Sequence, residues 1–152
     1  MKLRIENQEI KLDDLYKIVE ILDEGELKAH MTRYLCIRSS GYLENVIKDL
    51  VITYVSASSS KFTSNFVEIE IRNFTNVTYD KLIKLLQRFS PDWSFDFDHQ
   101  ISDQQRSSLN SIISNRNSIA HGHQDNLSYK SMKEYYIDLK NIIKLLKSVI
   151  KK

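Results

Sequence analysis

Glycine, proline and cysteine are scarce in this chain, which has 3 Gly, 1 Pro and 1 Cys among 152 residues. β-Sandwiches and β-barrels need frequent glycine- and proline-containing turns between short strands. The shortage therefore argues against those folds and favours long helices with few interruptions. The single cysteine, Cys36, has no second thiol with which to form an intramolecular disulfide, so we expect a reducing compartment. Its apolar, helical surroundings predict a small core residue.

Several functional motifs are also missing. The chain has no glycine-rich loop of the P-loop or Rossmann type, which argues against an ATPase or a nicotinamide enzyme. No serine lies in a nucleophile-elbow pattern. No apolar run approaches the length of about 18 residues that a membrane-spanning helix needs. The charged start, residues 1–6, does not resemble a signal peptide. We therefore expect a cytoplasmic protein with no membrane partner.

The composition is ordinary for a soluble protein, with 41% hydrophobic and 28% charged residues. We expect one domain over residues 1–152, of which about residues 1–25 form an N-terminal helical extension. The net charge of +2 conceals an asymmetry, because residues 130–152 contain seven lysines against Glu134 and Asp138. That segment carries +5, which leaves −3 for the rest of the chain. A basic C-terminal helix would either attract a polyanion or present a solvated face.

Helical spacing of apolar residues covers the first half of the chain. It predicts a short helix over 13–22 and a long helix over 26–57, with a serine-rich loop at 56–60. Residues 66–71 are rich in β-branched side chains, but an isolated strand would have nothing to pair with, so we expect a helix. Side chains predicted on the apolar sides of the first two helices include Leu15, Ile18, Val19, Leu27, Met31, Tyr34, Leu35 and Leu43.

Capping residues mark the helices of the second half. Thr78 is a suitable N-cap for a helix through Phe89, which the segment Ser90-Pro91-Asp92 ends. Ser102 and Gln105 form a capping box that opens the next helix. Ser128 caps a last helix that runs to 150.

Two connections are predicted between these helices: a loop packed against the bundle by Trp93, Phe95 and Phe97, and a tight turn at 124–126. These features together predict an all-α fold, a helical bundle with a long second helix and short connecting helices.

The segment Arg116-Asn117-Ser118-Ile119-Ala120-His121-Gly122 ends one of the predicted helices. Arginine is a permanent cation, and histidine exchanges protons near neutral pH. Cleavage of a phosphate ester without a metal needs both functions. Gly122 suits the left-handed conformation that terminates helices.

The spacing within this motif bears on the oligomeric state. Asn117 and His121 are four residues apart and share a helix face. Arg116 precedes His121 by five residues, which places the two side chains roughly 140° apart around an ideal helix. One straight helix therefore does not focus both groups on one atom. Either two copies of the helix meet across a twofold axis, or fraying at Gly122 moves His121.

The motif, its position and the following helix resemble HEPN domains, and in particular the stand-alone RiboL-PSP type. In that group an upstream helix carries a segment similar to 38–44, and the resemblance covers roughly residues 26–150. It implies a metal-independent endoribonuclease that acts as a homodimer and needs no cofactor. The roles implied are general acid or base for His121, phosphate binding for Arg116, orientation of these groups for Asn117, and site support or substrate binding for Glu44 and Arg38.

The resemblance has one departure. Some HEPN toxins are silenced by modification of a tyrosine two residues after the motif histidine, whereas this chain has His123 there. His123 would assist phosphate binding or be a solvated loop residue. His121, His123 and Asp125 do not make a convincing metal site, because the ligands come from one short segment. His30 and His99 are expected to be packed or surface residues.

Three functions remain open at this stage. The first is an RNA-cleaving dimer, as a toxin or antiviral-defence effector, with RNA as substrate and a cognate antitoxin or regulatory protein as partner. The second is a non-catalytic HEPN module that binds RNA or a partner protein. The third is a helical dimerisation domain in which Arg116 and His121 form interface hydrogen bonds.

Overall fold

The computed structural model describes residues 2–123 and 126–151, and this part of the chain forms seven helices and no strand. The predicted all-α fold is therefore confirmed. In chain order the helices are α1 (Lys2–Glu20), α2 (Glu26–Ser58), α3 (Lys61–Ile71), α4 (Tyr79–Phe89), α5 (Pro91–Gln100), α6 (Asp103–Ala120) and α7 (Tyr129–Ile150).

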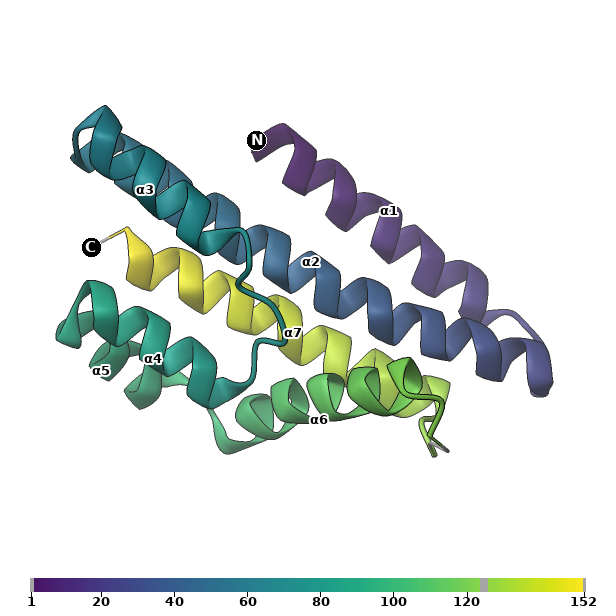
Figure 1. Ribbon diagram of the computed structural model, residues 1–152. Helices are drawn as coiled ribbons and strands as arrows, with labels where there is room; N and C mark the ends of the chain where they lie inside the picture. The colour runs from purple at the N-terminus through teal and green to yellow at the C-terminus, as the bar shows by residue number, and fades with distance from the viewer. Residues whose placement is uncertain (1, 124–125, 152) are drawn as a thin grey trace.

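The long helix α2 is the centre of the bundle (Figure 1). Helix α1 packs along one side of α2, while α6 and α7 pack together and against it. Helices α4 and α5 form a hairpin, with α5 resting on α7 and α4 touching α6. Helix α3 folds back along the C-terminal half of α2. The core lies where α2, α6 and α7 meet, and its fully buried side chains there include Leu35, Leu43, Ile47, Leu109, Ile112, Leu139 and Leu146.

Polar bonds fasten α1 to the rest of the bundle. The Tyr16 and Tyr136 rings stack with their centroids 4.2 Å apart. The Tyr16 hydroxyl lies 2.7 Å from the hydroxyl of Ser39, and the Tyr136 hydroxyl donates to Asp13 at 2.5 Å. Burial raises the pKa of both tyrosines well above the ordinary value of 10.0, and the bond to Asp13 raises that of Tyr136 further.

The predicted caps are confirmed in detail. The Thr78 hydroxyl accepts the Lys81 backbone N–H at 3.3 Å, and Ser128 accepts that of Ser131 at 3.1 Å. At the start of α6, Ser102 accepts the Gln105 N–H at 3.0 Å. Gln105 in turn accepts the Ser102 N–H at 2.9 Å, which completes the capping box.

Helix α1 is longer than predicted. We expected a helix over 13–22, but α1 covers Lys2–Glu20. Ile5, Leu12 and Val19 lie seven residues apart and are all buried, so one stripe anchors the whole helix. Ile18, predicted to face inward, is 56% exposed.

The expected loop around 93–97 is a helix. Pro91 follows α4 and is a stop signal for it, but proline also suits the first position of a helix, and α5 begins there. Trp93 and Phe97 are buried as predicted, since they lie four residues apart on the inner face. Phe95, two residues from each, is 68% exposed.

Other predictions were closer to the structure. Residues 66–71 are helical as expected, within the longer α3. Cys36 is fully buried, and its thiol donates to the Ile112 carbonyl at 3.4 Å. Leu27 and Tyr34 were expected inside but are exposed. The predicted turn at 124–126 lies largely outside the described residues. None of the described helices is long and apolar enough to cross a membrane.

Candidate functional site

The end of α6 presents the motif on a Schellman turn. The Gly122 N–H donates to the Ile119 carbonyl at 3.1 Å, and the His123 N–H donates to the Ser118 carbonyl at 2.9 Å. Gly122 has φ +69°, the left-handed conformation predicted from the sequence. His121 is the C-cap residue, and its side chain is exposed. The histidine is therefore held at a defined helix end and accessible to a ligand.

Arg116 points to a different part of the molecule. Its guanidinium is half-buried, and Nη1 donates to Asn76 Oδ1 at 2.5 Å and, more weakly, to Asn117 Oδ1 at 3.5 Å. Asn76 lies in the segment between α3 and α4. Arg116 makes no ion pair within the described residues, because both of these partners are neutral amides. Its positive charge is therefore not neutralised by these bonds.

Asn76 holds its position through two backbone contacts. It has φ +53°, a left-handed conformation that asparagine tolerates better than most residues. Its carbonyl accepts the Thr78 N–H at 2.9 Å. Its own N–H donates to Glu44 Oε1 on α2 at 3.1 Å. A chain of hydrogen bonds thus runs from Glu44 through Asn76 to Arg116, and it links α2, the α3–α4 connection and α6.

The structure therefore brings together three of the residues selected from the sequence, Arg116, Asn117 and Glu44, with Asn76 between them. Sequence analysis missed Asn76, although one signal for it exists. An asparagine two residues before the helix cap Thr78 is a favourable turn residue. Its side-chain partner is 40 residues away, and only the fold could show it.

The two histidines form a separate pair. The His121 and His123 rings lie edge to face with centroids 6.1 Å apart, and both side chains are exposed. No hydrogen bond between described residues joins this pair to Arg116. In one chain, the cation and the candidate proton carrier of the motif therefore have different surroundings.

Arg38 lies apart from both groups. Its guanidinium sits over the Tyr34 ring, 5.5 Å from the centroid, and Nη1 donates to the Tyr34 hydroxyl at 2.9 Å. The structure shows no hydrogen bond or ion pair from Arg38 to Glu44 or Arg116 among the described residues. The remaining histidines, His30 and His99, are also surface residues, in contact with Arg33 and Phe95 respectively.

No group of three His, Cys, Asp or Glu side chains with metal-binding geometry occurs among the residues that the structure describes. Asp125, considered above with the two histidines, lies outside them. The chemistry that this arrangement offers is that of its own side chains: an anchored arginine for an anion, and an accessible imidazole for a proton.

Comparison with known proteins identifies the family. The family model described as RiboL-PSP-HEPN matches residues 3–152. No curated protein and no solved structure matches the chain. The match extends further towards the N-terminus than the resemblance noted from the motifs, so α1 is part of the family fold. The chain belongs to the RiboL-PSP-HEPN family.

Proposed function

We propose that this protein is a metal-independent endoribonuclease that acts as a homodimer, with Arg116, Asn117 and His121 in a composite active site. Membership of the HEPN family supports an RNA-related function. The observation that carries the proposal is the state of Arg116. Its side chain is held by Asn76, yet within the described part of the chain no carboxylate neutralises it. A guanidinium kept in one place and left unneutralised suits a phosphate diester.

The reaction is an attack of the ribose 2′-oxygen on the adjacent phosphorus. The bond between O2′ and phosphorus forms, the bond between phosphorus and the 5′-oxygen breaks, and a 2′,3′-cyclic phosphate and a 5′-hydroxyl result. One proton leaves the 2′-hydroxyl and one reaches the leaving oxygen. His121 carries one of these protons, because an exposed imidazole can change its charge near neutral pH. Arg116 stabilises the negative charge on the phosphorane oxygens.

The separation of these groups in one chain supports the proposed homodimer. Arg116 is directed to the α3–α4 connection, whereas His121 stands beside His123 at the exposed helix end. A second copy across a twofold axis near the end of α6 would place the histidine of one copy beside the arginine of the other. Glu44 then acts at a distance, by holding Asn76 in place.

Incubation of purified protein with total cellular RNA in EDTA tests the proposal. We expect the wild type to cleave, and the His121→Ala and Arg116→Ala variants to be inactive while remaining folded. His99→Ala is the matched control, since His99 is also an exposed histidine near a helix end. Absence of cleavage over a broad RNA pool would favour the second function, a HEPN module that binds RNA or a protein without cutting.

We also propose that the enzyme is cytoplasmic and controlled by a partner, as a toxin or antiviral-defence effector would be. The exposure of His121 and His123 supports control by a partner, because a cognate antitoxin or regulatory protein could cover both. Co-expression in cells gives a test. The wild type alone should slow growth, and the His121→Ala variant should not.

A further inference from the structure

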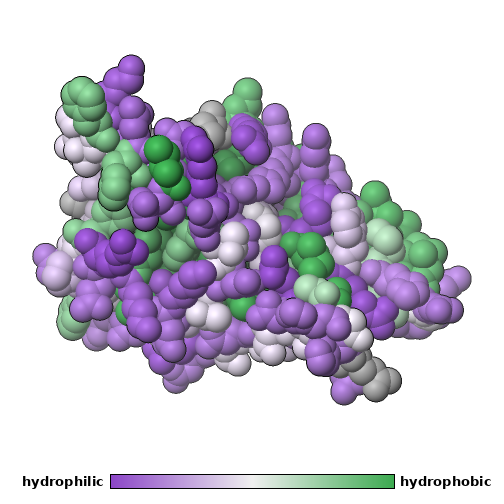
Figure 2. Space-filling model, in the orientation of Figure 1, coloured by the Kyte–Doolittle hydropathy of each residue, from purple (hydrophilic) through white to green (hydrophobic). Residues whose placement is uncertain are grey.

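Helix α3 turns most of its apolar side chains towards solvent. Phe62 is 87% exposed, Phe66 66% and Ile69 58%. The spacings of four and three residues place all three on one face, which we call the α3 stripe. The hydropathy surface has apolar side chains over this end of the molecule (Figure 2). A contiguous exposed apolar patch of this kind marks an interaction site.

The opposite side of α3 buries few side chains against the rest of the protein. Only Ile71 is buried on this helix, and the packing is chiefly against α2. Ile71 comes nine residues after Phe62, which places it about 180° around the helix from the α3 stripe. A helix of 11 residues is marginal by itself and depends on packing for its stability. Burial of the stripe would supply that packing.

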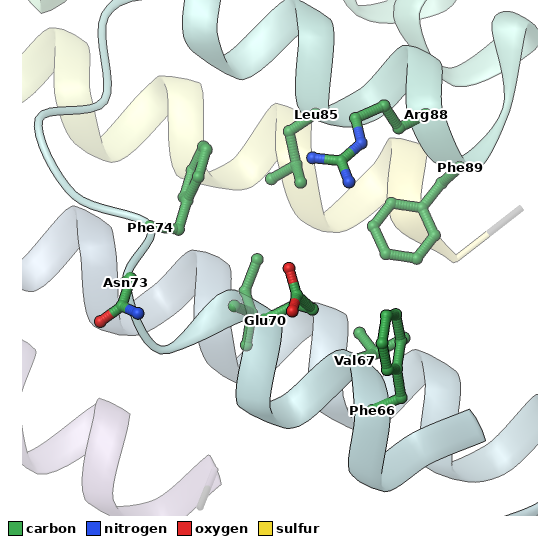
Figure 3. A pocket seen from close by; sticks show the side chains of 9 residues that line it. Phe66, Val67, Glu70, Asn73, Phe74, Leu85, Arg88 and Phe89 are labelled. Atoms are coloured by element: carbon green, nitrogen blue, oxygen red, sulfur yellow. The ribbon is translucent and has the colours of Figure 1, made fainter. Parts of the chain in front are cut away.

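An open groove lies beside the α3 stripe. A groove of about 290 Å³ lies between α3 and α4, and Phe66 and Phe89 face each other across it (Figure 3). Glu70 and Arg88 also line it. A partner that covers the stripe can place a side chain here, next to Phe66.

We propose that the α3 stripe is an interface between two copies of this chain, with the two α3 helices antiparallel around a twofold axis near residue 65. The charges on α3 favour a second copy of α3 as the partner that covers the stripe. Lys61 and Glu68 lie seven residues apart, on the same flank of the stripe and at opposite ends of it. Neither makes an ion pair within the described residues, and they are too far apart along the helix to meet each other.

In an antiparallel twofold pair, the same flank of both helices meets. The N-terminal end of one flank then lies beside the C-terminal end of the other. Lys61 then lies opposite the partner's Glu68, and the same pair forms twice. A parallel twofold would bring opposite flanks together at equal heights, so Lys61 and Glu68 would not meet each other across it. Within one copy, a lysine at the helix N-terminus and an acid near the C-terminus also oppose the helix dipole. The antiparallel partner brings the favourable charge to each end, so a second copy of α3 complements it in both shape and charge.

This interface does not depend on the proposed ribonuclease activity. Helix α3 and the C-terminal end of α6 lie at opposite ends of the molecule (Figure 1). The α3 contact therefore leaves Arg116 and His121 uncovered. If both contacts form, the smallest closed assembly is a tetramer, whereas the α3 contact alone gives a dimer.

Cross-linking tests the position of the axis. The native Cys36 is fully buried, so one introduced surface cysteine gives an interpretable signal. Asn65→Cys places thiols next to the axis, and mild oxidation should convert most of the protein to a covalent dimer. Phe95→Cys is the control, because position 95 is also exposed but lies on α5. Cross-linking of Asn65→Cys no faster than that of Phe95→Cys would overturn the proposal.

Charge reversal tests the identity of the partner. By light scattering, Glu68→Lys and Phe66→Ser should each lower the mass of the assembly to about half. The double variant Lys61→Glu/Glu68→Lys should regain the wild-type mass, because both intermolecular pairs are restored with their signs exchanged. Its charges also suit the α3 dipole, so helix loss does not confuse the result.

Unchanged mass in both single variants, or a wild type that is monomeric, would overturn the proposal. Loss of RNA cleavage with retained Asn65→Cys cross-linking would instead contradict only the proposed function.

Discussion

Arg116 and Asn76 are 40 residues apart in the sequence and are joined by a hydrogen bond of 2.5 Å between Nη1 and Oδ1. The bond crosses from α6 to the α3–α4 connection, and Glu44 of α2 holds the other side of Asn76. The orientation of the motif arginine is thus decided by two parts of the chain outside the motif.

Asn76→Gly should lower the rate of RNA cleavage by about tenfold or more while the protein stays folded, because Arg116 loses its anchor. Glycine adopts the positive φ of this position without strain, so the change isolates the side-chain amide. Single-turnover cleavage assays would measure the effect. Asn73→Gly, an exposed position in the same connection, is the control and should have wild-type activity. Asn76→Asp keeps an acceptor for Arg116 but neutralises its charge with a carboxylate, so this variant should also lose most of the rate. Equal losses in Asn76→Gly and Asn73→Gly would refute the anchoring role.

Glu44→Gln should behave like the wild type, because the amide oxygen still accepts the Asn76 N–H. Glu44→Ala should lose about 1 kcal/mol of unfolding free energy, since the N–H loses its partner. It should also lose activity, because the connection that carries Asn76 is released. Urea unfolding and cleavage assays on both variants give the comparison. If Glu44→Gln were as inactive as Glu44→Ala, the carboxylate charge itself would take part in the reaction, contrary to this account.

A mixture of Arg116→Ala and His121→Ala proteins should recover part of the activity that each lacks. A mixed dimer contains an intact arginine in one copy and an intact histidine in the other, which a composite site can combine. Random exchange makes about half of the dimers mixed, and each mixed dimer has one intact site of two, so recovery should reach about a quarter of the wild-type rate. The assay is RNA cleavage before and after mixing under conditions that allow subunit exchange. No recovery after verified exchange would mean that each site is built from one chain.

The free energy of unfolding should fall as the pH rises above about 10, the ordinary pKa of tyrosine. Tyr16 and Tyr136 have raised pKa values in the folded protein because they are buried. Below that pH both phenols are protonated in the folded and the unfolded chain, and their contribution is complete. Above that pH the two phenols ionise in the unfolded chain but stay protonated in the folded protein. The free energy of unfolding therefore falls. Urea unfolding at about pH 8 and about pH 10.5 would show the difference.

Tyr136→Phe should reduce this fall in the free energy of unfolding, because one of the two phenols with a raised pKa is removed. Tyr135→Phe on the same helix is the matched control and should keep the wild-type dependence. An identical pH dependence in all three proteins would contradict the assignment to Tyr136.

The local signals in the sequence were reliable where short-range chemistry decides the structure. The capping residues Thr78, Ser102 and Ser128 begin their helices as predicted, because each bond spans three residues. Gly122 ends α6 for the same kind of reason. The signals were weaker where one residue type serves two purposes. Pro91 can follow one helix and begin another, and the local pattern does not decide between them.

The sequence by itself determined the helical class, most helix starts and the motif that led to the HEPN family, because periodicity, caps and short motifs depend on neighbours in the chain. Only the tertiary structure decided which residues surround that motif. In the folded chain, hydrogen bonds connect Glu44 to Asn76 and Asn76 to Arg116. Arg38 instead contacts Tyr34, and the α3 stripe is exposed to solvent. These relationships depend on how helices that are far apart in the sequence pack together. Many packing arrangements satisfy the same local sequence pattern, and only the common hydrophobic core selects one of them.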